Sequence, residues 1–390
     1  MPGKLIVSAL PGEVRAAVLT GDRLTDLLVL RDDGPPQAGD LFLARLLRFE
    51  KGLDGAFVEL GLERPGLLPR QEMTGPLPAE GTTLPVKVLR APGGDKGARV
   101  SAKLSPEEAE RLTGRKAPAR LPAENGPLLT LLRAAAPETV VTDDVALMNR
   151  LKAQTAVGNY DFTLHSDPAP LFEVWEIETQ VEALLQPLVE TPGGASLLIE
   201  PVQTLTAIDV NAGRHDGRGG AAVQAREVNL SLVPEIARQL RLRAISGLIA
   251  IDFLALRKPE DRKAVAGALR KAVAGDPEPC QVFGLSPSGL LEMTRRRGRL
   301  PLHEVLCRPC GLGGRGWEKT PVTLAYEALR RAAAARSSGA TKIGLRAAPP
   351  VAAALQGAQA AALEAVAERL GAPLAVVADP LVESYDLVLG

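Results

Sequence analysis

Thr-Ala-Ile-Asp-Val-Asn at residues 206–211 and Leu-Ile-Ala-Ile-Asp-Phe at residues 248–253 are two short apolar segments that each carry an aspartate near the end. A helical pattern separates them, and two strands joined by a helix normally pair in parallel, with their ends at one edge of a sheet. We therefore expect Asp209 and Asp252 to converge. Carboxylates so close repel unless a cation lies between them, and hard oxygen ligands suit Mg²⁺ or Mn²⁺.

A simpler interpretation is that each aspartate caps the helix that follows it, a common role for Asp. Asn211, which stands beside the first aspartate, favours a binding site instead. Around the two segments the pattern predicts further strands and helices of one α/β unit, at residues 197–199, 223–243, 259–274 and 281–285.

Composition predicts a globular protein of more than one domain. The chain has 390 residues, of which 46% are hydrophobic and 24% charged. No apolar run is long enough to span a bilayer, and the start of the chain does not resemble a signal peptide. Three cysteines are too few for a disulfide framework, so we expect a cytoplasmic protein that does not enter a membrane.

The formal net charge of zero argues against general coating of nucleic acid, but not against a local basic groove. Arginines cluster in two places that could grip a polyanion: Arg238, Arg241 and Arg243, and Arg295, Arg296, Arg297 and Arg299. The alternative is that each cluster is a solvated helix or loop face.

The first hundred residues show a β pattern. Residues 13–31 predict a hairpin, and five short strands between residues 39 and 103, with glycine turns, predict an OB-type barrel. Phe57 on that barrel could stack on a base and Lys96 could contact phosphate. The alternative is that Phe57 belongs to the barrel core.

The rest of the chain alternates helix and strand. Residues 104–135, rich in Pro, Ala, Gly and charge, predict a connector. A strand and helix at 140–156 and an amphipathic helix at 178–189 follow. After Trp317 the pattern predicts helices at 323–335 and 351–370 and strands at 342–345, 374–378 and 385–389.

Cys307 and Cys310 are separated by two residues and followed by a glycine-rich loop. Two thiolates supply half of a tetrahedral Zn²⁺ site. Either two chains share one Zn²⁺, or the pair is redox-active, or it is merely buried.

Five segments, in this order, resemble the signature blocks of the ribonuclease E/G family: 205–211, 235–243, 247–253, 289–297 and the Cys-x-x-Cys-Gly loop. Residues 56–61 and 66–69 also resemble its RNA-binding barrel. The resemblance implies a mixed α/β multidomain fold. Its parts would be an RNase H-like subdomain (1–38 and 136–194) interrupted by an S1-type OB-fold barrel (39–103), a connector (104–135), a DNase I-like catalytic subdomain (195–305), a zinc link (306–316) and a small C-terminal α/β domain (317–390).

The resemblance also implies roles. Asp209 and Asp252 match the family's Mg²⁺-binding aspartates, and Asn211 matches the asparagine that positions the scissile phosphate. Cys307 and Cys310 match the zinc-link pair that joins two chains in a homodimer, which can assemble further into a tetramer. Among the RNA-contacting candidates, Phe57 and Lys96 match barrel positions, and Arg238, Arg241, Arg295 and Arg297 lie within or at the edge of the signature blocks.

Some positions depart from the family pattern. Leu67 replaces the second barrel aromatic, Ala255 replaces an acidic residue, and Pro287 and Ser288 replace a basic residue and a Phe. The segment after the barrel is too short for the family's 5′-sensor subdomain. We expect a Mg²⁺-dependent endoribonuclease acting on single-stranded RNA. The alternatives are a catalytically weak or inactive RNA-binding or assembly protein of the same fold, and a thiol redox protein.

Overall fold

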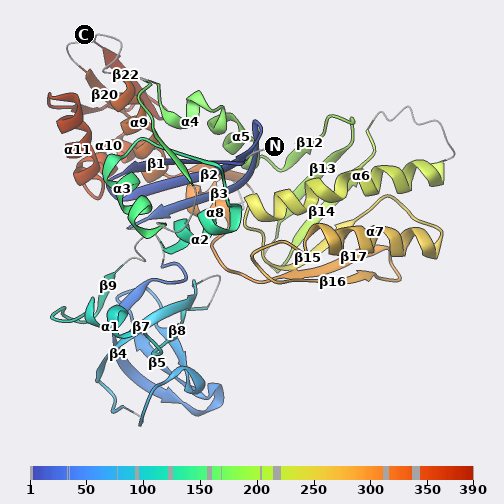
Figure 1. Cartoon of the computed structure of the whole chain (residues 1–390), viewed down its shortest axis with the longest axis horizontal. Coiled ribbons are helices and arrows are strands. Elements are labelled where there is room, and N and C mark those ends of the chain that lie inside the picture. The colour runs from blue at the N-terminus through green and yellow to red at the C-terminus, as the bar shows by residue number, and fades with distance from the viewer. Residues whose placement is uncertain are drawn as a thin grey trace. The chain divides into compact units, whose positions relative to one another are not determined.

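The computed structural model describes residues 3–389 except 33, 35, 77, 93–95, 122–125, 156–159, 168, 203, 214–220, 311–315 and 336–342. The chain forms two compact units (Figure 1). One contains residues 1–33, 134–296 and 301–390, and the other contains residues 34–133 and 297–300. No helix among the described residues is long and apolar enough to cross a membrane.

The first sheet of the larger unit has five strands in the order β11-β10-β1-β2-β3. Their bounds are β1 Gly3–Leu10, β2 Glu13–Thr20, β3 Arg23–Arg31, β10 Thr139–Thr142 and β11 Asp161–Leu164. The predicted hairpin is confirmed, because β2 and β3 pair antiparallel. Three helices accompany this sheet: α3 Val145–Gln154, α4 Leu171–Val174 and α5 Ile177–Leu184. Helix α5 packs its apolar stripe, Ile177, Val181 and Leu184, against Ile6, Leu19 and Leu24.

The smaller unit contains a closed barrel. Strands β4 Leu41–Glu50, β5 Gly55–Glu59, β6 Gly66–Pro69, β7 Thr83–Arg90 and β8 Arg99–Ser101 follow one another in the order β5-β6-β8-β7-β4, and the β5–β4 pairing closes the ring. These are the five predicted barrel strands. The expected connector adds helix α1 Pro106–Glu110 and strand β9 Ala119–Leu121, which pairs with β4. Helix α2 Gly126–Ala135 follows, and two 3-10 turns lie at Lys51–Leu53 and Arg70–Glu72.

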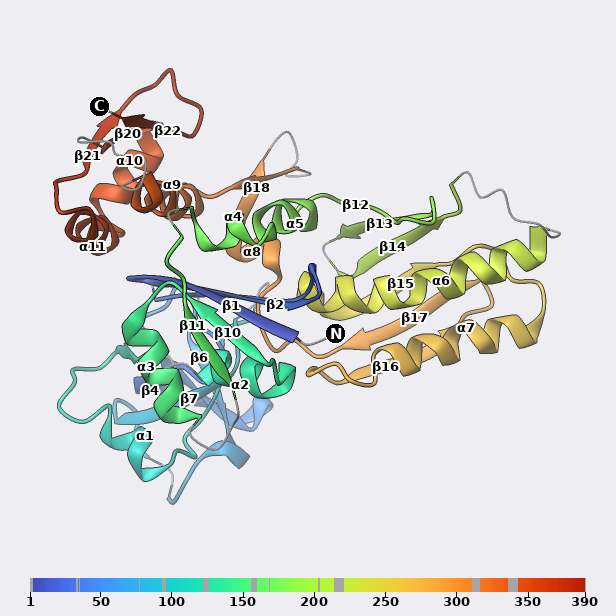
Figure 2. The same cartoon turned by 45° about the horizontal axis from the view of Figure 1, so that its top comes forward.

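A six-stranded sheet in the larger unit carries the two aspartates. Its order is β12-β13-β14-β15-β17-β16. The strands are β12 Leu188–Glu190, β13 Ser196–Pro201, β14 Thr206–Asn211, β15 Gly247–Asp252, β16 Cys280–Leu285 and β17 Leu290–Arg295. Helices α6 Ala221–Leu242 and α7 Pro259–Ala272 lie side by side and pack on this sheet (Figures 1 and 2). The sheet's apolar core is formed with these two helices.

A hairpin and a small α/β segment complete the larger unit. Helix α8 Leu302–Leu306 leads into strands β18 Cys307–Cys310 and β19 Gly316–Lys319. The remaining elements are α9 Pro321–Ala335, β20 Ile343–Ala347, α10 Pro349–Gln356, α11 Ala360–Leu370, β21 Ala375–Ala378 and β22 Tyr385–Leu389. The single helix expected at 351–370 is wrong. It is divided at Gly357, where an added Cβ would lie 2.9 Å from the Ala353 carbonyl oxygen.

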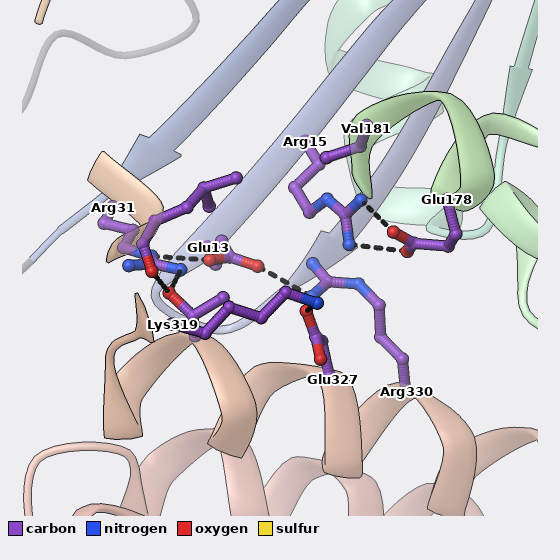
Figure 3. Close-up of a pocket in the computed structure, with 10 residues that line it drawn as sticks. Glu13, Arg15, Arg31, Glu178, Val181, Lys319, Glu327 and Arg330 are labelled. Carbon is purple, nitrogen blue, oxygen red and sulfur yellow. Dashed lines mark hydrogen bonds and ion pairs between the residues drawn. The ribbon is translucent and has the colours of Figure 1, made fainter. Parts of the chain in front are cut away.

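A cluster of buried charges joins α9 to the first sheet (Figure 3). Glu13 is bound on one side by Arg31 Nε (2.6 Å) and on the other by Arg330 Nη1 (2.6 Å). Arg15 forms two parallel hydrogen bonds to Glu178 of α5, at 2.7 and 2.8 Å. The cavity among these side chains is about 10 Å³, which is room for about one water molecule.

Two carboxylates of this cluster, Glu13 and Glu178, have lowered pKa values in spite of burial. Burial raises the pKa of Glu13, but the nearby Arg330 and Arg31 guanidinium groups outweigh it and hold that pKa below its usual 4.5. Arg15 does the same to the pKa of Glu178. A buried charge is tolerated when it is paired in this way. Removal of one partner leaves the other charge buried without compensation for its lost hydration, which destabilises the fold.

We expect Arg330→Met to lower the free energy of unfolding by about 3–5 kcal/mol, because it leaves Glu13 buried with one arginine. Urea unfolding measures this. The matched control is Arg331→Met, since Arg331 is exposed and pairs with the exposed Glu173; it should change stability by less than about 1 kcal/mol.

The depressed pKa of Glu13 also fixes the sign of the pH dependence. Ionised Glu13 contributes its full share to the free energy of unfolding above pH 4.5. This contribution declines as the pH falls toward the pKa of Glu13 in the folded state. Glu13→Gln should therefore be less stable at pH 7 but show a shallower decline below pH 4.5. A steeper decline would contradict this assignment.

Candidate active site

Asp209 and Asp252 lie opposite each other on two neighbouring parallel strands. β14 and β15 pair in parallel, with Asp209 in register with Asp252. Adjacent strands are about 4.8 Å apart, so the two carboxylates leave the sheet as immediate neighbours. The strand, helix and strand order predicted this pairing, and the structure confirms it.

The alternation of buried and exposed side chains along β14 and β15 determines the sheet face on which the two aspartates lie. Ile208 and Ile251 are 1% and 0% exposed and belong to the core formed with α6 and α7. The next residue of each strand is an aspartate, partly exposed at position 209 and exposed at position 252. Because successive side chains point to opposite faces, both acids lie on the face away from the helices.

Asn211 completes the group. It is exposed at the end of β14, and its Nδ2 donates a hydrogen bond to Asp209 Oδ2 at 2.9 Å. This bond fixes one carboxylate oxygen of Asp209. Among the described residues, none bonds the amide oxygen of Asn211, which remains available to a ligand.

Neither aspartate caps a helix. Asp209 lies inside β14, well before the start of α6, and the N-cap residue of α7 is Lys258. The capping interpretation therefore fails for both. Two carboxylates and an amide are a hard oxygen donor set that fits Mg²⁺, an ion that usually keeps several waters and takes only one or two protein carboxylates. Consistent with so small a set, no group of three or more His, Cys, Asp or Glu suited to a metal occurs among the described residues.

The two cysteines lie on the β18–β19 hairpin. Cys307 begins β18 and is 6% exposed, whereas Cys310 ends it and is partly exposed. Burial raises the pKa of Cys307 to about 11. Gly316, opposite Cys310, makes room for the thiol, because a Cβ there would lie 2.9 Å from Cys310 Sγ. The loop residues Gly311–Gly314 lie outside the described residues.

The outward face of the barrel carries Phe57. Its neighbours Ala56 and Val58 are buried, whereas Phe57 is partly exposed and is not among the barrel core residues. The core alternative for Phe57 is therefore excluded. Arg48 lies over its ring, with the guanidinium carbon 5.5 Å from the ring centroid.

Phe57 stands in a row of side chains that crosses the barrel. Each member is in register with the next across neighbouring strands: Arg48, Phe57, Leu67, Arg99 and Arg90. Leu67 thus occupies the place beside Phe57 where a second aromatic was expected. Lys96, the other predicted barrel contact, is exposed just before β8.

The four predicted RNA-binding arginines outside the barrel differ in their surroundings. Arg295 has only 2% of its side chain exposed and pairs with Asp276 at 2.8 Å, and Arg238 pairs with Glu235 and donates to the Leu24 carbonyl. The structure gives these two a role in holding elements together. The remaining two are accessible in part: Arg241 donates to the Thr25 carbonyl, and Arg297 is partly exposed.

The other departures lie near the two aspartates. Leu290, the register partner of Asp252 on β17, follows directly after the turn that contains Pro287 and Ser288, both exposed. Ala255 is exposed three residues beyond Asp252. Neither change removes a member of the Asp209, Asn211 and Asp252 group.

Two features of the site were missed at the sequence level. The arginine row depends on barrel register, including an irregularity between Leu46 and Arg48, which local patterns do not reveal. Asn229 of α6, 0% exposed, makes two hydrogen bonds to Leu254 just after Asp252. The available signal was a polar residue that stands three and four positions before the apolar residues Leu232 and Val233, which are buried in the core.

Comparison with known proteins identifies the family of this chain. The model of the ribonuclease E/G family matches residues 99–298, just over half of the chain. The chain belongs to the ribonuclease E/G family.

Ribonuclease G of Salmonella typhimurium (strain SL1344) is 26% identical over 491 aligned residues, which cover 100% of both chains. Ribonuclease G of Escherichia coli (strain K12) is also 26% identical, over 490 residues and all of both chains. Ribonuclease E of the same strain is 27% identical over 411 residues, covering 80% of this chain and 39% of that protein.

Proposed function

We propose that this chain is a Mg²⁺-dependent endoribonuclease that cleaves single-stranded RNA in RNA processing or decay. The observation that carries the proposal is the register pairing of Asp209 with Asp252 on one open sheet face, with Asn211 bonded to the first. The named relatives, ribonucleases G and E, support the same activity.

The chain's own residues would act by binding and orienting. Asp209 and Asp252 would hold the cation, and Asn211 would keep Asp209 in one orientation while its free amide oxygen faces the ligand. A bound Mg²⁺ (or Mn²⁺) supplies Lewis-acid polarisation of the phosphate and a more acidic water. Asn211 and Asp252 are exposed and Asp209 is partly exposed, which suits an extended single strand better than an enclosed small molecule.

The barrel row supports an RNA substrate. Phe57 offers a ring for base stacking, worth about 1–3 kcal/mol per base, and Arg48, Arg90 and Arg99 offer cations along the same row. Lys96 would add a phosphate contact. With Leu67 beside Phe57, stacking would be limited to about one base, so electrostatics would supply most of the barrel's affinity.

A second candidate is an RNA-binding or assembly protein that does not cleave. The reduced stacking row and the changes at Ala255, Pro287 and Ser288 favour it. The retained group of Asp209, Asn211 and Asp252 opposes it, because binding alone does not require two adjacent carboxylates that repel phosphate.

We expect Asp209→Asn or Asp252→Asn to reduce cleavage by about 10³-fold or more, because a neutral amide holds the cation poorly. RNA affinity should stay within a fewfold. The measurements are cleavage of a fluorescent single-stranded oligoribonucleotide with and without Mg²⁺, and fluorescence anisotropy without it. Phe57→Ala is the converse control, which should weaken binding but keep cleavage at saturating RNA. Cleavage at the wild-type rate by either Asn variant would remove the pair from the mechanism.

We also propose that Cys307 and Cys310 bind half of a Zn²⁺ site shared by two chains. The thiols lie on one short hairpin, and the described part of the chain provides no third Cys or His grouped with them. We expect about one Zn²⁺ per two chains, a homodimer or a tetramer built from it, and dissociation by Cys307→Ser. Metal analysis and mass in solution measure this, and one Zn²⁺ per chain would contradict sharing.

We also propose a cytoplasmic location, because three cysteines are too few for the disulfide framework typical of secreted proteins. Expression with a fluorescent tag tests it, and a membrane or extracellular signal would refute it.

We further propose that cleavage does not depend on the 5′ phosphate of the RNA. The alignment with the Salmonella relative has 491 positions against the 390 residues of this chain, so 101 positions (491 − 390) hold no residue of it. A chain that lacks this much sequence has little room for a separate end-binding subdomain. Matched 5′-monophosphate and 5′-hydroxyl oligoribonucleotides should be cleaved at similar rates, and a tenfold preference for the monophosphate would refute this.

A further inference from the structure

The loop of residues 253–258 connects Asp252 at the end of β15 to the start of α7. It is fixed at two points. Asn229 Nδ2 donates to the Leu254 carbonyl at 2.9 Å, and the Leu254 N–H donates to Asn229 Oδ1 at 3.0 Å. Two residues on, Arg262 Nε donates to the Leu256 carbonyl at 2.8 Å. The loop therefore has a defined path directly beside the candidate site.

Asn229 uses both ends of its amide on the backbone of one residue, Leu254. It is 0% exposed, and it lies on the buried side of α6 beside the core residues Val228 and Leu232. An apolar residue would fill such a position without the need for buried partners. The amide instead ties the helix that follows β14 to the loop that follows β15, so it links the surroundings of both aspartates.

This loop carries Arg257 and Lys258, both exposed. No hydrogen bond or ion pair of either side chain is found with the described residues. Residues 253–258 contain no acid, and of the two acids in the first turn of α7, Asp261 already pairs with Arg226 at 3.1 Å. Glu260 is the one carboxylate nearby on the same element that could compete for them.

Two positive side chains just before α7 do not stabilise the start of that helix. The first turn of a helix carries a partial positive charge, which disfavours Lys and Arg there. Lys258 stands at the N-cap, where Ser, Thr, Asp or Asn would accept a hydrogen bond, and its side chain makes no capping bond. Residues that oppose local stability in this way often serve binding instead.

We propose that Arg257 and Lys258 contact phosphate groups of the RNA strand next to the one that is cleaved, and that Asn229 is the positioning residue that holds their loop. This rests on the proposed ribonuclease function. Arg257 lies five residues from Asp252, so at most about 17 Å of extended chain separates their Cα atoms. A strand crossing the open face at Asp209 and Asp252 would pass within reach of both cations, whose charge offsets the repulsion between RNA and the two carboxylates.

The first experiment compares Arg257→Ala/Lys258→Ala with Arg150→Ala/Lys271→Ala in the full chain. Both double variants remove two exposed positive charges from the larger unit. Affinity for a fluorescent single-stranded oligoribonucleotide is measured without Mg²⁺ at several salt concentrations. Loss of two phosphate contacts should make the slope of log affinity against log salt shallower by about 1.4, and the affinity at low salt should fall about tenfold or more. The control should keep the wild-type slope.

Cleavage with Mg²⁺ separates failure of this proposal from failure of the proposed function. The Arg257→Ala/Lys258→Ala variant should raise KM about tenfold and change kcat less than about threefold. If the wild-type chain cleaves RNA but the Arg257→Ala/Lys258→Ala variant keeps the wild-type salt slope and KM, the proposed phosphate contact is wrong. The proposed ribonuclease function would then remain supported. A wild-type chain that does not cleave would refute the function itself.

The second experiment tests the positioning role of Asn229. Asn229→Ala is compared with Gln239→Ala, which removes a buried amide of the same helix that bonds Glu235 and Arg243 instead. Both variants should lose thermal stability. Well below their unfolding temperatures, only Asn229→Ala should raise KM, by about threefold or more, because only it releases the loop that carries Arg257 and Lys258. An equal effect on KM in both variants would reduce Asn229 to a structural residue and overturn its positioning role.

Discussion

The parallel pairing of β14 with β15 is the constraint on which the candidate site depends. Ile208 and Ile251 must be buried under α6 and α7, and this requirement turns the following residue of each strand to the open face. A slip of one residue in either strand would bury a carboxylate and expose an isoleucine. The adjacency of Asp209 and Asp252 is therefore maintained by the hydrophobic effect, although the acids themselves repel each other.

The features that the sequence predicted are those encoded by local pattern. Alternation and turns identified the barrel strands and the hairpin of β2 and β3, and the strand, helix and strand order identified the β14–β15 pair. What it missed depends on long-range partners. β17 enters the sheet between β15 and β16, and Arg295 finds Asp276 only after that sheet has formed. Gly357 is a local exception. A single glycine within an alanine-rich pattern does not by itself predict the end of a helix, yet α10 ends there.

Burial divides the arginines of this chain into two kinds. Arg238 and Arg295 hold a helix and a strand in place through carboxylates and backbone carbonyls. Arg48 and Arg257 remain exposed, one on the barrel and one beside the aspartates. A net charge of zero conceals this division, since many of the balancing acids are partners of the buried arginines. Sequence clusters of arginine are thus poor guides to which arginines lie on the surface.

The buried charge cluster limits how a gene for this protein can be shortened during evolution. Glu13 comes from the start of the chain, and Arg330 reaches it from 317 residues further on. A stop codon placed after β19 would remove Arg330 and leave a carboxylate in the interior with Arg31 as its one close partner. Loss of the residues after β19 would therefore destabilise the rest of the larger unit unless position 13 changed as well. Deletions within surface connections leave this cluster intact and so meet no such barrier.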